Sequence, residues 1–216
     1  MRWKKLGMVW RPDGKSDWAR THGMGPTPFK LNDDVIRIFI TCLDEKGRGR
    51  PGAVDVAAAD PTRVLRVFPQ PFLDIGEPGT FDENGLAVTG IVESKPGTIF
   101  MYYSGFELCT HIRYRIFTGL AMSRDGGVTF QRHGRAPILD RTDDELYFRC
   151  APFPMFDEGV FKLWYVAGSE WTHVGGKALP VYDLRYQESN DGIRWQPQGT
   201  LSLPLTGTDE HGFGRP

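Results

Sequence analysis

The clearest concentration of chemically useful side chains lies in the stretch from Asp140 to Trp171. An acidic and aromatic approach precedes a predicted strand, and the pair Glu170-Trp171 follows the next strand. The approach consists of Asp143, Asp144, Glu145, Tyr147 and Phe148. Carboxylates can transfer protons, and aromatic faces stack on sugar rings, although aromatic residues also fill the cores of sheets. We therefore look here first for a site, with carbohydrate as one ligand class.

Composition narrows the classes of function. The 216 residues carry 26 basic and 27 acidic side chains, a net charge of -1, which does not favour a nucleic-acid partner. No apolar run approaches the roughly 20 residues that span a bilayer, and the N-terminus lacks the apolar region of a signal peptide. Three cysteines, Cys42, Cys109 and Cys150, have no metal-ligand spacing. We expect a cytoplasmic protein without a metal or other cofactor, and no membrane partner.

The elements that must position these side chains are short strands in a repeated order. Predicted second strands at 35–41, 98–104 and 160–167 align Phe39, Tyr102 and Tyr165 at intervals of 63 residues. Further strands are expected at 6–10, 29–31, 52–57, 85–93, 117–123, 150–156 and 184–189, with turn-strand units at 125–132 and 191–196. A repeat of about four strands at this period is typical of propeller blades. The sequence therefore predicts an all-β protein.

A Ser-x-Asp-Gly turn followed by an aromatic residue occurs twice, at Ser123–Phe130 and Ser189–Trp195. The Asp can accept hydrogen bonds from amides of its own turn, Gly accepts a positive φ, and the aromatic residue can fill a gap between strands. We interpret both turns as structural.

The repeats resemble the five-bladed β-propeller glycosidases, a superfamily that includes the levanase/invertase, arabinanase/xylosidase and β-mannoside phosphorylase families. The closest likeness is to bacterial glycosidase-like propellers. The residues that carry the resemblance are His22, Pro26-Thr27-Pro28, Arg37-Ile38-Phe39, Gly52-Ala53-Val54-Asp55, Phe81-Asp82-Glu83-Asn84-Gly85, Met101-Tyr102-Tyr103-Ser104-Gly105, Leu163-Trp164-Tyr165-Val166-Ala167-Gly168 and Gly214-Arg215-Pro216.

The resemblance implies that the innermost strand of each blade lines a central funnel and that acids at the start of these strands do the chemistry. It selects Asp82 and Glu83 before the second blade, and Asp144 and Glu145 before the third. Glycosidic cleavage uses one carboxylic acid and one carboxylate roughly 5 to 10 Å apart. We expect Glu145 to be the general acid and Asp82 the base or stabiliser.

Other polar and aromatic residues are expected to bind the substrate. They are His22, Arg149, Trp171, Glu170, Arg215 and His211. Gly25 stands before Pro26, where the hydrolase families ordinarily place an Asp, and Arg149-Cys150-Ala151-Pro152 stands in place of a Glu-Cys-Pro acid motif. Two alternatives to a hydrolase therefore stay open: a non-catalytic glycan-binding propeller, and a phosphorylase that needs one protein acid and phosphate.

The period also predicts how the chain is divided. One propeller domain, 1–216, contains blades at about 18–75, 80–140 and 141–204, and the next blade starts at 205–216. A five-bladed ring needs about 300 residues at this period, so we expect a truncated propeller, with missing blades supplied elsewhere or with self-association through open sheet edges.

Overall fold

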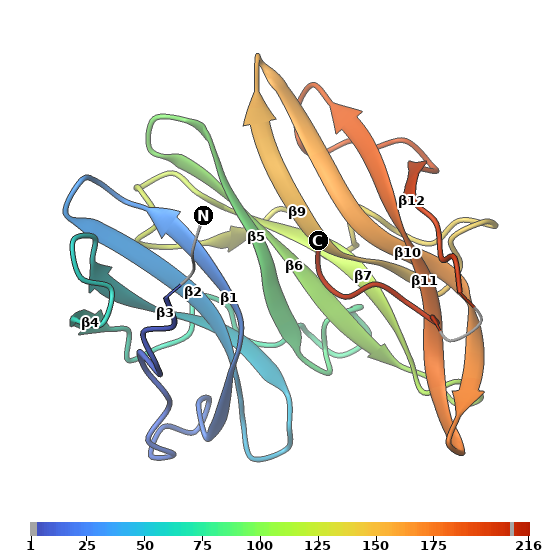
Figure 1. The fold of residues 1–216 in the computed structure, drawn as a ribbon, viewed down its shortest axis with the longest axis horizontal. Coiled ribbons are helices and arrows are strands. Elements are labelled where there is room, and N and C mark those ends of the chain that lie inside the picture. Colours follow the sequence, from blue (N-terminus) through green and yellow to red (C-terminus); the bar gives the residue numbers. More distant parts are fainter. Residues whose placement is uncertain (1–3, 208–209) are drawn as a thin grey trace.

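The protein is built from β-strands joined by turns and loops, as expected for an all-β fold (Figure 1). A computed structural model describes residues 4–207 and 210–216. Thr208 and Asp209, inside the predicted start of a further blade, lie outside the described residues. None of the described residues belongs to a helix long and apolar enough to cross a membrane. The strands are β1 (Thr21–Lys30), β2 (Val35–Leu43), β3 (Gly49–Ala57), β4 (Val64–Val67), β5 (Leu86–Lys95), β6 (Thr98–Leu108), β7 (Tyr114–Ser123), β8 (Gln131–Arg132), β9 (Phe148–Asp157), β10 (Val160–Val174), β11 (Lys177–Ser189) and β12 (Thr200–Leu203).

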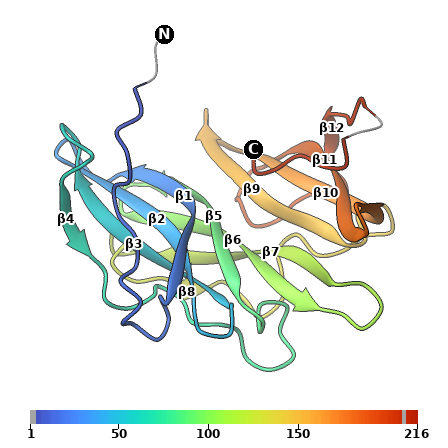
Figure 2. The same cartoon turned by 60° about the horizontal axis from the view of Figure 1, so that its bottom comes forward.

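The strands form three consecutive antiparallel units of four, which we call blades 1, 2 and 3. Blade 1 has the order β1-β2-β3-β4. Blade 2 (β5–β8) and blade 3 (β9–β12) make one eight-stranded sheet, because β7 and β9 pair in parallel through two residue pairs. The first strands β1, β5 and β9 lie next to one another, and the later strands of each blade extend outward from them (Figures 1 and 2). This is the arrangement of successive propeller blades.

Each inner strand is irregular near its start, and in β5 and β9 a side-chain hydroxyl of the preceding blade accepts a hydrogen bond there. The pairing of β1 with β2, of β5 with β6, and of β9 with β10 shifts register at equivalent positions. Thr41 Oγ1 accepts a hydrogen bond from the Val88 amide at 3.0 Å, and Ser104 Oγ accepts one from the Ala151 amide at 2.9 Å. Thr41 and Ser104, like Val88 and Ala151, are separated by one 63-residue repeat. The same link therefore joins blade 1 to blade 2 and blade 2 to blade 3.

Aromatic packing repeats in the same way. The rings of Phe39 in blade 1 and Phe130 in blade 2 meet edge to face at 5.8 Å. The rings of Tyr102 in blade 2 and Trp195 in blade 3 meet in the same manner at 6.4 Å. Such ring pairs stabilise the folded protein by more than the burial of their apolar area alone. The described residues therefore hold one core between each pair of neighbouring blades.

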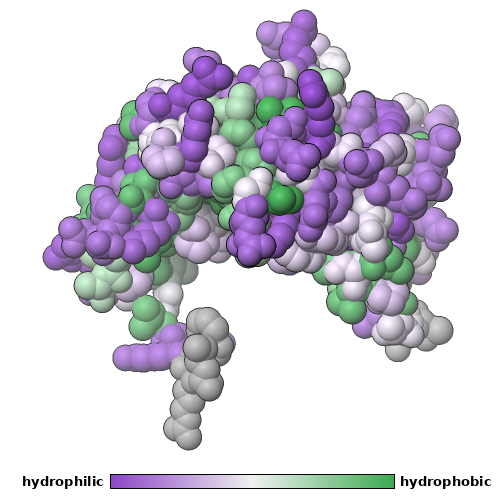
Figure 3. Space-filling view, turned by 90° about the horizontal axis from the view of Figure 1, so that it is seen from above, coloured by the Kyte–Doolittle hydropathy of each residue, from purple (hydrophilic) through white to green (hydrophobic). Residues whose placement is uncertain are grey.

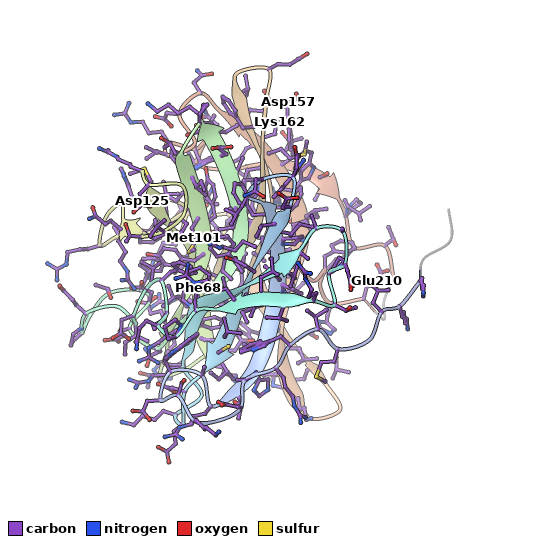
Figure 4. All side chains as sticks on the ribbon, turned by 90° about the vertical axis from the view of Figure 1, so that its left-hand side faces the viewer. Phe68, Met101, Asp125, Asp157, Lys162 and Glu210 are labelled. Carbon is purple, nitrogen blue, oxygen red and sulfur yellow. The ribbon has the colours of Figure 1, made fainter. Side chains whose placement is uncertain are left out.

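The two Ser-x-Asp-Gly turns are structural, as predicted. Asp125 Oδ1 accepts hydrogen bonds from the amides of Val128 and Thr129. Each turn also receives a donor from the preceding blade, because Arg37 donates to Gly127 O at 2.6 Å and the Tyr102 hydroxyl donates to Gly192 O at 2.7 Å. In Figure 4, Asp125 lies on its loop at the surface, whereas Met101 belongs to the buried core between blades 1 and 2.

Four predictions about strands are wrong. The unit at 191–196 contains a turn without a strand, and the strand β12 follows it. No strand forms at 6–10, where the chain instead passes over blade 1 and packs Trp10 against it. The segment with Glu170 and Trp171 is not a loop, since β10 continues through it and pairs with β11. Trp164 rather than Tyr165 corresponds to Tyr102, because both are the fifth residue of the strand after the hairpin turn. A one-residue slip moves a side chain to the other face of a sheet.

The Tyr102 hydroxyl allows a test of the contact between blades. Tyr102→Phe removes the hydrogen bond to Gly192 O inside a buried region and leaves that carbonyl without this donor. We expect the free energy of unfolding in urea to fall by about 1 to 2 kcal/mol. Tyr186→Phe removes a hydroxyl at the surface and should change stability by less than about 0.5 kcal/mol. Equal effects of the two substitutions would show that the hydroxyl does not join the blades.

Candidate functional site

Glu145, the predicted general acid, is fully buried beside β10. Its two carboxylate oxygens accept hydrogen bonds from the Tyr165 hydroxyl at 3.0 and 2.9 Å, and Arg149 Nε lies 2.5 Å from Oε2. The Gly199 amide donates to Oε1 at 3.4 Å, and Arg185 Nε lies 3.6 Å from the same atom. Burial raises the pKa of Glu145, against the opposing charge of Arg149. These contacts are those of a carboxylate that holds parts of a blade together.

Burial also keeps the hydroxyl of Tyr165, beside Glu145, protonated. It raises the pKa of the Tyr165 hydroxyl to about 12, so the hydroxyl keeps its proton at neutral pH and donates it in a hydrogen bond. Arg149 completes the cluster by donating to Asp140 O at 2.8 Å and to Gln196 O at 3.0 Å. Arg149 is 3% exposed, so these contacts with the protein occupy a guanidinium that was predicted to bind substrate.

Asp82, the predicted base, has corresponding surroundings in blade 2. Arg132 lies within 2.9 Å of Asp82 Oδ2 through both Nε and Nη2, and the Thr80 hydroxyl donates to Oδ1 at 2.9 Å. Asp82 is 1% exposed. Glu83, its neighbour, accepts a hydrogen bond from the Gly79 amide. Asp82 and Glu145 are thus bound in separate clusters, one in each blade, and in neither cluster does the carboxylate face open solvent.

Two predicted residues lie on or against β1. His22 is exposed, and its φ of 62° is unusual for a residue with a side chain. Arg215 reaches β1 from the C-terminal segment: it donates to Gly25 O at 2.9 Å and to the Thr27 hydroxyl at 2.8 Å. Burial lowers the pKa of Arg215. A Cβ at Gly25 would lie 3.4 Å from Arg215 Nη1. This arginine therefore stands beside the residue that replaces the usual first-blade carboxylate.

The other three predicted residues lie in blade 3 and in the C-terminal segment that packs against it. Trp171 packs against Tyr114 and Phe148, with ring centroids at 5.2 and 5.5 Å. Glu170 contributes to a shallow polar hollow of about 270 Å³ that the buried Glu145 lines together with Asp144 and Asp183. His211 Nδ1 lies 3.2 Å from Pro180 O. The structure brings Glu145 and Arg149 together, and it does not gather the eight predicted residues at one site.

A pocket of about 320 Å³ opens between blades 1 and 2, at the end where β1 and β5 begin. We call it the mouth pocket. Its floor and walls are mainly apolar and aromatic, and its polar groups come from a few side chains and from glycine backbone. It is lined by Met24, Thr41, Leu43, Gly47, Gly49, Asn84, Leu86, Ala87, Phe106, Leu108, Arg113 and Tyr114. An apolar hollow with a few convergent polar groups is the usual form of a small-molecule site.

Aromatic rings continue from the mouth pocket into blade 3. Phe106 and Tyr114 meet edge to face at 6.2 Å, and the Arg113 guanidinium lies 5.4 Å from the centroid of the Tyr114 ring. Tyr114 also contacts Trp171, which thereby supports the wall of the pocket from behind. Among the described residues, no group of three or more His, Cys, Asp or Glu side chains is arranged to hold a metal ion. The pocket can therefore offer stacking surfaces and hydrogen-bond donors.

The sequence reasoning missed the mouth pocket because its residues come from six strands and three loops and include no conspicuous motif. Met24, two residues after His22, and Asn84, two residues after Asp82, are the pocket residues nearest in sequence to predicted site residues. A usable signal was Phe106-Glu107-Leu108, in which apolar and polar residues alternate beyond the predicted end of the strand at Ser104. Strand β6 therefore carries Phe106 and Leu108 to the pocket.

The chain is similar to two curated sequences. No family model matches it. The uncharacterized proteins Rv1502 and MT1551, from two strains of Mycobacterium tuberculosis, are each 29% identical to it over 216 residues, which is the whole of this chain and 71% of each relative.

Solved structures of glycoside hydrolases share its fold. Sucrose-6-phosphate hydrolase from Lactobacillus gasseri superposes with a TM-score of 0.62 at 16% identity over 88% of this chain and 37% of that one. Zg3597, a family 117 glycoside hydrolase from Zobellia galactanivorans, gives 0.62 at 13% identity over 81% and 55%. Bombyx mori β-fructofuranosidase BmSUC1 gives 0.58 at 16% identity over 80% and 33%. The chain spans less than two thirds of these structures, and it has the β-propeller fold of the glycosidases.

Proposed function

We propose that this chain binds carbohydrate at the mouth pocket, as a glycan-binding propeller. The observation that carries the proposal is the composition of the pocket, in which Phe106 and Tyr114 supply ring surfaces and Asn84, Thr41 and Arg113 supply polar groups. Aromatic faces bind the apolar faces of sugars, and a few fixed polar groups select their hydroxyls. Neighbours of the same fold are named as hydrolases of a phosphorylated sucrose and of β-fructofuranosides, which supports a sugar as the ligand class.

Catalysis by Glu145 and Asp82 fits the contacts less well. A general acid must come within hydrogen-bond reach of the oxygen that it protonates, and its partner must reach water or the anomeric carbon. Glu145 is 0% exposed and Asp82 is 1% exposed, and arginine contacts both carboxylates. The residues that line the mouth pocket include no carboxylate. We therefore favour binding over hydrolysis, with phosphorolysis as an outcome of the same experiments.

The outer face of blade 3 supports a second proposal, about partners. Phe153, Trp164 and Tyr186 form an aromatic row across β9, β10 and β11, with neighbouring centroids 6.5 and 4.8 Å apart. Blade 1 presents Phe39 to blade 2, and blade 2 presents Tyr102 to blade 3, whereas Trp164 at the corresponding position remains partly exposed. Figure 3 shows hydrophobic residues in the middle of one face of the molecule and towards both of its ends, among hydrophilic residues. We infer that a second copy of the chain covers this row when no other sheet does.

The charges around the aromatic row suit such pairing. Lys162 lies 2.6 Å from Asp157 at the end of the β9–β10 hairpin, and the two residues lie close together in Figure 4. Lys162 pairs across the strands with Glu188, so both signs of charge flank the apolar row. Two such faces can place opposite charges against each other around a shared apolar centre.

The three cysteines are free, which supports the proposal of a reducing compartment such as the cytoplasm.

The first prediction concerns sugar binding. Tyr114→Leu removes a ring from the wall of the pocket while keeping an apolar side chain, and we expect affinity for a bound oligosaccharide to fall about tenfold. The measurement is isothermal titration calorimetry, after a glycan array has identified a ligand. Tyr186→Leu, on the outer face of blade 3, is the control and should bind as wild type does. If the control loses affinity and Tyr114→Leu does not, the mouth pocket is not the site.

The second prediction separates a structural Glu145 from a catalytic one. Glu145→Ala leaves the buried Arg149 without its charge partner, so we expect the free energy of unfolding to fall by about 3 to 5 kcal/mol. Glu45→Ala, at an exposed loop residue, should leave stability unchanged.

The same two variants and Glu145→Gln are assayed on chromogenic glycosides and oligosaccharides, with and without phosphate. We expect no turnover by wild type in either condition. Turnover that Glu145→Gln abolishes while the variant stays folded would replace binding by catalysis, and a requirement for phosphate would identify phosphorolysis.

The third prediction concerns the aromatic row. Multi-angle light scattering after gel filtration should find wild type above the mass of one chain at tens of micromolar, and Trp164→Lys at the mass of one chain. Leu65→Lys, on the exposed part of β4, is the matched control and should associate as wild type does. A wild-type protein that stays monomeric over this range would contradict the proposed pairing.

A further inference from the structure

The charges around the mouth pocket are unequal, and this inequality bears on the ligand. Arg113 is the one charged side chain that lines the pocket. Within the described part of the chain, Arg113 forms no ion pair with a carboxylate, and its guanidinium rests near the Tyr114 ring. A guanidinium held over an aromatic ring keeps its donors directed away from the ring face.

Two carboxylates next to pocket residues in the chain, Asp44 and Glu107, are bound by arginine, whereas Glu83 accepts hydrogen bonds from the Gly79 amide and from Asn84 Nδ2. Asp44 follows Leu43 and lies 2.9 Å from Arg48 Nη2 and 2.8 Å from Arg50 Nη1. Burial opposes the charge of Asp44, but the hydrogen bonds from Arg50 and Arg48 outweigh it and hold the pKa at about 2. Asp44 is therefore ionised at neutral pH and already paired, so it does not balance the charge of Arg113.

Glu107 is the second such carboxylate, and it lies between the pocket residues Phe106 and Leu108. Successive side chains of a strand point to opposite faces, so Glu107 points away from the pocket. It lies 3.0 Å from Arg115 Nε and 3.2 Å from Arg141 Nη2. Two arginines thus surround the one acid of this strand end, so Glu107 does not neutralise Arg113, the one positive charge that lines the pocket.

A second guanidinium adds positive charge along β1. Arg215 binds the backbone of Gly25, the residue after Met24 of the pocket, and its contacts there are to neutral oxygens only. Arg215 is partly buried, and this burial lowers the pKa of its guanidinium. The positive charge of Arg215 at this position favours an anion in the adjoining mouth pocket.

We propose that the mouth pocket selects a sugar that carries an anionic group, a carboxylate or a phosphate, which Arg113 binds. The inference rests on the proposed sugar site and specifies its ligand class. The ring of the sugar stacks on the side formed by Phe106 and Tyr114, and the anionic group receives charge-assisted hydrogen bonds from the guanidinium. Such a contact to a charged group is enough to separate an anionic sugar from its neutral counterpart by about tenfold or more.

The test compares pairs of ligands that differ in charge alone. Cello-oligosaccharides are titrated against the same oligosaccharides oxidised at C6, and glucose against glucose 6-phosphate, with inorganic phosphate as a separate probe. We expect the anionic member of a pair to bind about tenfold tighter at low salt, with the difference shrinking as salt rises. Preference within the first pair assigns a carboxylate, and preference within the second assigns a phosphate.

Variants locate the contact. Arg113→Gln should abolish the preference for the anionic member, because its affinity for that member falls about tenfold while its affinity for the neutral member falls by less, and Arg66→Gln, on exposed β4, should preserve the preference. Binding of neutral and anionic members with equal affinity would overturn the charge selection and leave the sugar site in place. Binding of inorganic phosphate as tightly as glucose 6-phosphate would overturn the role of the ring. Absence of binding by every sugar would overturn the proposed function itself.

Discussion

The fold depends on the packing of each blade against the apolar face of its neighbour. A four-stranded blade has two faces with apolar side chains, and only a neighbouring layer can remove both from water. In this protein the contact is specified by a repeated set of interactions: an aromatic ring against an aromatic ring, a side-chain donor into the turn of the next blade, and a hydroxyl on the amide of the next inner strand. These interactions fix both the spacing of the blades and the shape of the inner strands.

This constraint also explains where the charged residues are. Asp82 and Glu145 precede inner strands, where the chain passes from one blade to the next and backbone groups need partners. Each is held by an arginine and lies beside a buried tyrosine, Tyr103 or Tyr165. Carboxylates used in this way order the connections between blades, and removing either partner would leave an uncompensated buried charge. The surface left at the start of β1 and β5 is then apolar, aromatic and positively charged.

Much of the fold could be predicted from the sequence because its period is visible in local patterns. The two Ser-x-Asp-Gly turns contain residue types that favour a few backbone conformations, and the structure confirms these turns. Register was harder: Tyr165 and Trp164 are both aromatic and adjacent, so the sequence alone did not reveal a repeat shortened by one residue. The segment at 6–10 has the composition of a strand but finds no strand to pair with.

The candidate site was less predictable, for a different physical reason. Glu145 and Arg149 attract notice as chemical groups, yet a sequence does not show that four partners surround a carboxylate. The mouth pocket arises from residues such as Leu43, Leu86 and Phe106, whose types are those of an ordinary core. Only the three-dimensional arrangement leaves them around an open space.

The bulge in β1 has a consequence for how this protein could have diverged from its structural neighbours. Gly25 has a φ of 58°, and Ala151, two repeats later, has a φ of 51° although it carries a Cβ. The backbone shape at this position therefore does not demand glycine. Every glycine codon becomes an aspartate or a glutamate codon through a single base change, and a carboxylate at position 25 would stand beside the guanidinium of Arg215. On this scaffold, a funnel with an acid on its first strand and one without are a single mutational step apart.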